Sequence, residues 1–449
     1  MGGNANDTAV ESPYRAGGGM YNFIGKPIVT NCTFSGNGAR EGGGMFNFGS
    51  STTVSNCIFS RNSALSGGGM SNVESGTTLT DCIFSFNHAD ANGGGMLNFE
   101  SSLTIGNCTF SGNSANWGGG MNNAESSTIL TYCIFRINRA DANGGGILNK
   151  QHSHTTLSHC VFSDNSATNG NSISCESYNQ QHPSQIQANN CIFWSDGNEI
   201  WNNDNSVITI TYSDVHGNWP GQGNIDADPC FADADNSNYH LKSEAGRWDV
   251  SVQTWVQDTV TSPCIDAGNP DSDWKKELWP NGERINMGIY GGTAEASMSL
   301  SDVGNIADLN IDGQVDYRDM RLLTDKWPHK NLLMPEDLSR DGIANFIDFA
   351  IFARILELLA SNPNPNHYAM GVRLDADLSW TSGRGAISHD FYFGTSNPPP
   401  FIRNQTATTF DPGTLAQGTR YYWRIDEVNP SGTTRGSVWT FWTMILPPP

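Results

Sequence analysis

The chain has 449 residues, of which 37% are hydrophobic and 15% are charged, and its net charge is −21. A length about three times that of an average domain predicts several domains, and the low charged fraction argues against coiled coils and long solvated helices. The acidic balance argues against nucleic acid as a partner, because a polyanion would be repelled, and it favours divalent cations. No apolar run is long enough to predict a membrane span.

The first third of the chain repeats with a period of 25 or 26 residues. Glycine triplets begin at Gly17, Gly42, Gly67, Gly93, Gly118 and Gly144. Each repeat also carries a Cys-x-Phe unit, with cysteines at Cys32, Cys57, Cys82, Cys108, Cys133 and Cys160. One asparagine follows the glycine triplet and another follows the Cys-x-Phe unit. Between these repeated residues, apolar and polar residues alternate with the period of two that is typical of half-buried strands.

Strands this short bury a face only if each repeat stacks on the next, so the pattern predicts a parallel β-helix. Cysteine and phenylalanine would form ladders inside it, and asparagine amides would bond along its axis. The GGGM and Cys-x-Phe repeats resemble those of right-handed parallel β-helix surface proteins, in particular polymorphic outer-membrane-protein-like ones. The resemblance implies a mainly β protein with a solenoid over residues 1–298, in which about 196–298 form a cap on the open end.

The cysteine content has two interpretations. Cysteines at one repeated ladder position act as small buried apolar residues and do not indicate a disulfide framework. Cys230 and Cys264 lie outside the repeat, and their spacing leaves open whether they are bridged.

Catalysis by the repeats has one candidate feature. Glu74, Glu100 and Glu125 recur four residues after the Met of successive GGGM units, so we expect them to stack about 4.8 Å apart along one edge. Alternate pairs would be about 9.6 Å apart, and these two separations are close to those of retaining and inverting glycosidases. The other interpretation is a solvated turn position. A lyase would need a base and a Lys or Arg that neutralises the uronate charge, whereas residues 1–195 contain only the lysines Lys26 and Lys150, and neither repeats in register with an arginine.

Two twelve-residue segments beginning at Asp308 and Asp337 carry oxygen-bearing side chains at positions 1, 3, 5, 9 and 12 and glycine at position 6. This is the pattern of a Ca²⁺ loop, in which the glycine turns the chain and alternate side chains converge. Each loop leads into one predicted helix, over 320–327 and 349–359. The two segments resemble a type I dockerin module covering 302–360, an all-α calcium-loop fold.

That resemblance implies two Ca²⁺ sites and a set of ligands. In the first loop they are Asp308, Asn310, Asp312, the carbonyl of Gln314, Asp316 and Asp319. In the second loop they are Asp337, Ser339, Asp341, the carbonyl of Ile343, Asn345 and Asp348. It also names a cohesin-like protein as a candidate partner. Positions 10 and 11 depart from the pattern of cellulosomal dockerins, which usually carry small hydroxylated residues there, because they are Tyr317-Arg318 and Phe346-Ile347.

A Pro-Asn linker is expected over 361–366, followed by short strands over 367–443 that resemble a fibronectin type III β-sandwich. Trp380 is expected to face Tyr421 and Trp423 across two sheets.

These features predict a secreted, multimodular, calcium-binding β-helix protein, a surface or matrix component associated with polysaccharide binding or degradation and not itself catalytic. The alternative is a polysaccharide lyase or glycoside hydrolase whose catalytic module is the β-helix. The first twenty residues lack the basic and apolar regions of a signal peptide, and the chain begins partway through a repeat. We therefore expect a signal peptide and further repeats upstream, and an extracellular or cell-surface location.

Overall fold

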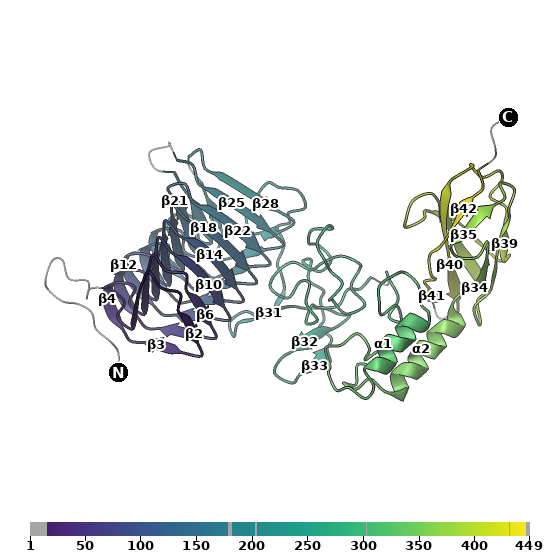
Figure 1. The fold of residues 1–449 in the computed structure, drawn as a ribbon, viewed down its shortest axis with the longest axis horizontal. Coiled ribbons are helices and arrows are strands. Elements are labelled where there is room, and N and C mark those ends of the chain that lie inside the picture. The colour runs from purple at the N-terminus through teal and green to yellow at the C-terminus, as the bar shows by residue number, and fades with distance from the viewer. Residues whose placement is uncertain (1–15, 178–181, 203, 302, 431, 446–449) are drawn as a thin grey trace. The chain divides into compact units, whose positions relative to one another are not determined.

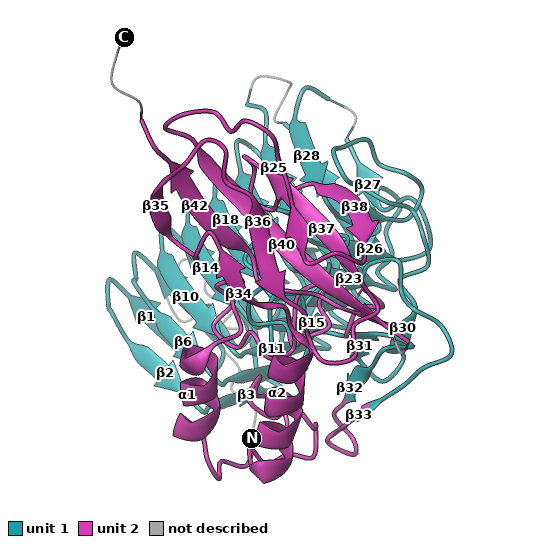
Figure 2. Ribbon diagram, turned by 90° about the vertical axis from the view of Figure 1, so that its right-hand side faces the viewer, with its two compact units in different colours: residues 1–248, 256–277, 284–297 teal, residues 249–255, 278–283, 298–449 magenta. Residues whose placement is uncertain are grey.

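The computed structural model describes residues 16–177, 182–202, 204–301, 303–430 and 432–445. The chain divides into two compact units, shown in different colours in Figure 2. The first comprises residues 1–248, 256–277 and 284–297, and the second comprises 249–255, 278–283 and 298–449. Each unit is described by itself.

The first unit is built on a β-solenoid of about eight turns, made of parallel strands (Figure 1). Sheet 1 contains β1 (Met20–Phe23), β5 (Met45–Phe48), β9 (Met70–Val73), β13 (Met96–Phe99), β17 (Met121–Ala124), β21 (Ile147–Lys150), β24 (Ile173–Cys175) and β27 (Ile200–Trp201). Sheet 2 contains β2 (Ile28–Thr30), β6 (Thr53–Ser55), β10 (Gly76–Thr80), β14 (Ser102–Gly106), β18 (Ser127–Thr131), β22 (His154–Ser158), β25 (Gln185–Asn189) and β28 (Val207–Thr211).

Two further sheets complete each turn. Sheet 3 contains β3 (Thr33–Ser35), β7 (Ile58–Ser60), β11 (Ile83–Ser85), β15 (Thr109–Ser111), β19 (Ile134–Arg136), β23 (Val161–Ser163), β26 (Ile192–Trp194) and β29 (Asp214–Val215). Sheet 4 has five strands, β4 (Gly38–Glu41), β8 (Ser63–Ser66), β12 (His88–Asn92), β16 (Ser114–Trp117) and β20 (Arg139–Asn143).

The interior of the solenoid confirms the predicted ladders. Successive phenylalanine rings stack along the axis, and the Phe84 and Phe135 centroids lie 4.8 and 4.6 Å from that of Phe110. From Asn22 to Asn123, the asparagine that follows a glycine triplet donates to its equivalent in the next turn, as Asn72 Nδ2 does to Asn98 Oδ1 at 2.9 Å. The ladder therefore satisfies polar groups that are completely buried.

The glycine triplets allow neighbouring turns to approach closely. The first glycine has a left-handed conformation, with φ of +66° at Gly93. A Cβ on the next residue, Gly94, would lie 2.4 Å from the carbonyl oxygen of Ser114 and 2.5 Å from that of Gly119. Any side chain there would collide with the backbone of the next turn.

All ten cysteines lie in the described part of the chain, and all are free thiols. Cys175 replaces the ladder asparagine and pairs in register with Asn149. Cys230 and Cys264 are not bridged. The Cys264 sulfur instead lies 3.2 Å from Asp214 Oδ2.

The end of the solenoid differs from the expected cap over 196–298. Strands β27, β28 and β29 extend the solenoid by another turn, and the following segment covers its end. There Trp219 packs against the core, and Asn224 Nδ2 donates to the Ile210 carbonyl at 2.9 Å.

The rest of the segment lies along the outer side of sheet 3, because outward-facing Val161 and Ile192 form an apolar cluster with Tyr239, Leu241 and Met287. It includes an antiparallel hairpin of β30 (Phe231–Asp233) and β31 (Asn238–Leu241). Phe231 therefore lies in this hairpin and not in a solenoid strand. A second small sheet contains β32 (Arg247–Asp249) and β33 (Thr254–Val256).

Among the described residues of the first unit, three carboxyl groups are buried, and we expect them to make its stability depend on pH. Burial raises the pKa of Glu199 and Asp214 to about 7 and that of Glu277 to about 8. Above the pKa of an ordinary carboxyl the native state then binds more protons than the unfolded state, so stability decreases as pH rises from about 5 to 8.

Calorimetry at pH 5.5 and pH 8 should show the higher melting temperature at pH 5.5. Glu277→Gln keeps an acceptor for the N–H groups of Asn286 and Gly292 and should flatten the profile. A melting temperature that is unchanged or higher at pH 8 would contradict this account.

The second unit contains two helices and a two-sheet domain. Helices α1 (Tyr317–Asp325) and α2 (Phe346–Leu358) bury Leu323 and Phe352 in one small core with Ala307 and Leu338. The smaller sheet contains β34 (Ser361–Asn364), β36 (Leu378–Thr381) and β39 (Thr409–Phe410). The larger contains β35 (Ala369–Val372), β42 (Trp439–Thr443), β40 (Arg420–Asn429), β37 (Ser388–Gly394) and β38 (Phe401–Gln405), with β41 (Gly432–Thr434) paired to β40.

Trp380 and Trp423 come from different sheets of this domain and meet in its core, with ring centroids 6.3 Å apart. The expected linker over 361–366 is wrong for its first four residues, because β34 pairs antiparallel with β36. Only Leu359 and Ala360 separate α2 from β34, and both are buried. The two-sheet domain therefore begins directly after the helix.

Candidate calcium centre

The two predicted loops have the same internal hydrogen bonds around their first residue. In the first loop, Asp308 Oδ1 accepts from the N–H of Asp312 at 3.1 Å and Oδ2 from that of Gly313 at 2.9 Å. In the second, Asp337 accepts from Asp341 at 3.1 Å and from Gly342 at 2.7 Å. The glycine at position 6 has φ of +80° in the first loop and +91° in the second, so both chains turn at the same place.

In each loop, the carboxylate at position 12 accepts hydrogen bonds from the N–H groups of positions 3 and 9. Asp319 accepts from the N–H groups of Asn310 at 3.1 Å and Asp316 at 2.8 Å. Asp348 accepts from the equivalent residues, Ser339 and Asn345, each at 2.7 Å. Asp319, Asp337 and Asp348 are fully buried. Each loop therefore holds its first and last carboxylates by backbone donors.

The helices begin three residues earlier than predicted, at Tyr317 and Phe346, because the residue at position 9 acts as the N-cap. Asp316 Oδ1 accepts from the N–H of Arg318, and Asn345 Oδ1 accepts from that of Ile347, each at 2.7 Å. The position 12 aspartate then occupies the third helical position and completes a capping box. One set of side chains thus shapes both the loop and the helix start.

The carboxyl groups of the loops repel one another where they are buried. Burial, followed by the nearby charges of Asp319 and Asp312, raises the pKa of Asp308 to about 7. Burial also raises the pKa of Asp319 and of Asp337. A bound divalent cation would offset this repulsion.

The donor set is all oxygen, as a hard cation such as Ca²⁺ requires. Within the described residues, no group of three or more His, Cys, Asp or Glu side chains is gathered closely enough to hold a metal. At position 5, the carboxylates of Asp312 and Asp341 accept from the N–H groups of Gln314 and Ile343. The loops therefore fit Ca²⁺ in donor chemistry, and ligation would need these side chains to converge further.

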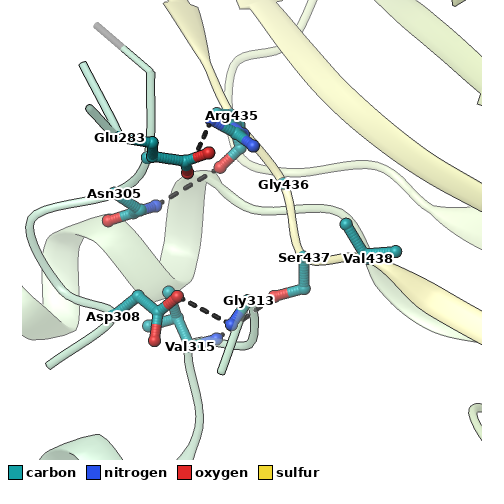
Figure 3. Close-up of a pocket in the computed structure, with 10 residues that line it drawn as sticks. Glu283, Asn305, Asp308, Gly313, Val315, Arg435, Gly436, Ser437 and Val438 are labelled. Atoms are coloured by element: carbon teal, nitrogen blue, oxygen red, sulfur yellow. Dashed lines mark hydrogen bonds and ion pairs between the residues drawn. The ribbon is translucent and has the colours of Figure 1, made fainter. Parts of the chain in front are cut away.

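The first loop is also bonded to the segment that precedes β42. Figure 3 shows Asp308 and Gly313 beside Ser437. The Val438 N–H donates to the Gly313 carbonyl at 3.1 Å, and the Val315 N–H donates to Ser437 Oγ at 3.2 Å. These partners lie more than 120 residues away in sequence, and no local pattern in the sequence indicates them.

The glutamates proposed as a catalytic ladder lie at turns after β9, β13 and β17. Glu74, Glu100 and Glu125 are exposed, and each has a left-handed backbone with φ of 48 to 50°. Ile24, Gly49 and Gln151 adopt the same conformation in other repeats. The turn therefore requires a left-handed backbone and does not require a carboxylate. These three glutamates lie on an exposed edge. The pKa of a catalytic general acid is raised by an environment that excludes water, and an exposed edge does not provide one.

The stacked turns and their internal ladders define a right-handed parallel β-helix repeat protein. Residues 155–268 match the model of a family described as disaggregatase related. The match starts in β22 and includes the last turns of the solenoid and part of the segment packed on sheet 3, which together make up about a quarter of the chain. No curated protein matches the chain. None of the helices among the described residues has the length and apolar character needed to cross a membrane.

Proposed function

We propose that the chain is a secreted, calcium-binding β-helix protein that serves as a surface or matrix component in contact with polysaccharide and is not itself an enzyme. The observation that carries the calcium-binding part is the identical arrangement of the two loops, whose equivalent residues lie 29 positions apart and make the same backbone contacts. Position 1, 3, 5, 9 and 12 side chains and the position 7 carbonyl would supply the ligands.

We interpret residues 302–360 as a dockerin-like module and the two-sheet domain as fibronectin type III-like. The support for a protein partner is the exposure of positions 10 and 11 of the loops. Tyr317 is 68% exposed, and Phe346 is 77% exposed. Large apolar side chains at equivalent positions of two related helices suit a protein partner with an apolar surface, which differs from the partner of dockerins that carry small hydroxylated residues there. The family match over 155–268 supports the β-helix part of the proposal and does not extend to these modules.

The alternative is a polysaccharide lyase or glycoside hydrolase that uses the β-helix. Its support is the recurrence of Glu74, Glu100 and Glu125 on successive turns. The purified chain should be assayed on uronate-containing and neutral polysaccharides, with and without Ca²⁺. Our proposal predicts no turnover on any of them. Turnover would contradict it, and loss of that turnover in Glu100→Gln but not in Glu244→Gln, an exposed control, would establish the ladder as the catalytic site.

A further inference from the structure

A strip of polar and aromatic side chains lies on the outer surface of the solenoid where sheet 4 leads into sheet 1. Asn92, Trp117 and Asn143 pair in register at the ends of β12, β16 and β20. Asn122 and Lys150 come from β17 and β21, where they alternate with inward-facing ladder residues and so point outward. Glu176 follows β24. We refer to these six residues as the Asn–Trp strip.

The strip is connected by hydrogen bonds across several turns. Asn92 Oδ1 accepts from Asn122 Nδ2 and from Lys150 Nζ, each at 3.1 Å. Asn143 Nδ2 donates to Glu176 Oε2 at 3.1 Å. Burial lowers the pKa of Lys150 and raises that of Glu176, so both charged groups lie where water is partly excluded.

The strip contains polar atoms without a partner. Asn122 is completely buried beneath its neighbours, and its Oδ1 has no hydrogen-bond partner. The hydroxyls of Ser71 and Ser174, in the same outward column of sheet 1, are also buried and unpartnered. Buried polar atoms are paired in the great majority of cases. These three atoms lie beneath the surface, so the side chains of the strip that a ligand could reach are the partly exposed Asn92, Trp117 and Asn143.

We propose that the Asn–Trp strip binds a neutral, hydroxyl-rich polysaccharide along the solenoid axis, which rests on the polysaccharide contact in the proposed function. The Trp117 side chain is 38% exposed between Asn92 and Asn143, so its indole can pack on the apolar face of a sugar ring while the flanking amides bond the hydroxyls. Asn92 Oδ1 already accepts two hydrogen bonds, and Asn143 is bonded to Glu176 and Asn169, so the groups left to bond sugar hydroxyls are the remaining N–H donors of the two amides.

The charge around the strip favours a neutral ligand over a uronate. Lys150 is the only cationic residue among the six residues of the Asn–Trp strip. Glu176 lies beside Lys150, and the nearby negative charge of Asp204 contributes to raising the pKa of Glu176. Glu41 lies in the same column as Asn92, two turns earlier. Arg40 acts on Glu41, so three carboxyl groups lie near two cations, a balance that does not favour an acidic polymer.

Affinity electrophoresis of the full chain tests the proposal. The gels would contain hydroxyethylcellulose, xyloglucan, galactomannan, polygalacturonate or alginate. We expect at least one neutral polymer to retard the chain and the two uronate polymers to leave its mobility unchanged. Trp117→Ala should weaken the retardation at least tenfold, and Trp117→Phe, which keeps an aromatic face, should restore most of it.

Ile129→Ala is the matched control, because Ile129 is also exposed, at 49%, but lies on sheet 2. It should bind like the unmodified chain. The proposal is overturned if no neutral polymer retards the chain, if a uronate polymer retards it more strongly, or if Trp117→Ala binds normally. A Ca²⁺ titration of the same preparation distinguishes this failure from failure of the calcium-binding proposal.

Discussion

Replacing Phe110 with alanine should lower the free energy of unfolding of the solenoid by about 3–5 kcal/mol, the usual cost of removing a large buried aromatic side chain. The Phe110 ring is fully buried and has a stacked ring on each side, so the cavity cannot be filled by movement of one neighbour alone. Urea denaturation followed by circular dichroism would measure the effect as a lower midpoint.

Ile129→Ala is again the control, and it should change the free energy of unfolding by only about 0.5 kcal/mol because the side chain is half exposed. If Phe110→Ala shifted the midpoint no more than this control, the phenylalanine ladder would not be the structural core of the solenoid.

Removal of Ca²⁺ with EDTA should increase amide hydrogen exchange of the two loops and helices α1 and α2 at least tenfold in the full chain. Without the cation, the carboxylate of Asp308 is repelled by that of Asp319, and the carboxylate of Asp337 by that of Asp348. Their hydrogen-bond donors are backbone N–H groups and, at Asp337, also the Ser339 hydroxyl. Peptides from β15 and β19 should keep their protection, because the solenoid core contains no such loop.

Asp337→Asn should reproduce this effect in the second loop even with Ca²⁺ present. Asp325→Asn is the matched control, because Asp325 is an exposed carboxylate at the end of α1, paired only at the surface with Arg321 at 3.6 Å. Equal exchange with and without EDTA in the unmodified chain would show that the loops are stabilised by their hydrogen bonds alone.

The solenoid could be predicted from the sequence because its core positions repeat. Each inward position recurs every 25 or 26 residues, so the ladders that contain Phe110 and Asn98 are visible as patterns in the sequence itself. The position of the later segment was not predictable in the same way. Val161 and Ile192 differ little from exposed Ile58 and Ile83 in sequence, yet only the former are covered by the chain that follows.

The position of the two twelve-residue loops could be read from the sequence because their residues are local, and the helix starts required correction by the N-caps Asp316 and Asn345. Ca²⁺ binding by these loops stays a prediction. The Asn–Trp strip was not predicted, because outward positions do not repeat. The column that contains Asn122 changes residue type from turn to turn. Lys150, which was out of register with any arginine, reaches Asn92 across 58 residues of sequence. Such a contact depends on the stacking of turns and has no signal within one repeat.

Isothermal titration of Ca²⁺ into the metal-free full chain tests the central claim most directly. We expect two binding sites, with one site lost in Asp308→Ala and the other in Asp337→Ala, because each aspartate occupies the first position of its own loop. Fewer than two sites in the unmodified chain, or two sites remaining in both variants, would contradict the assignment of these loops as calcium sites.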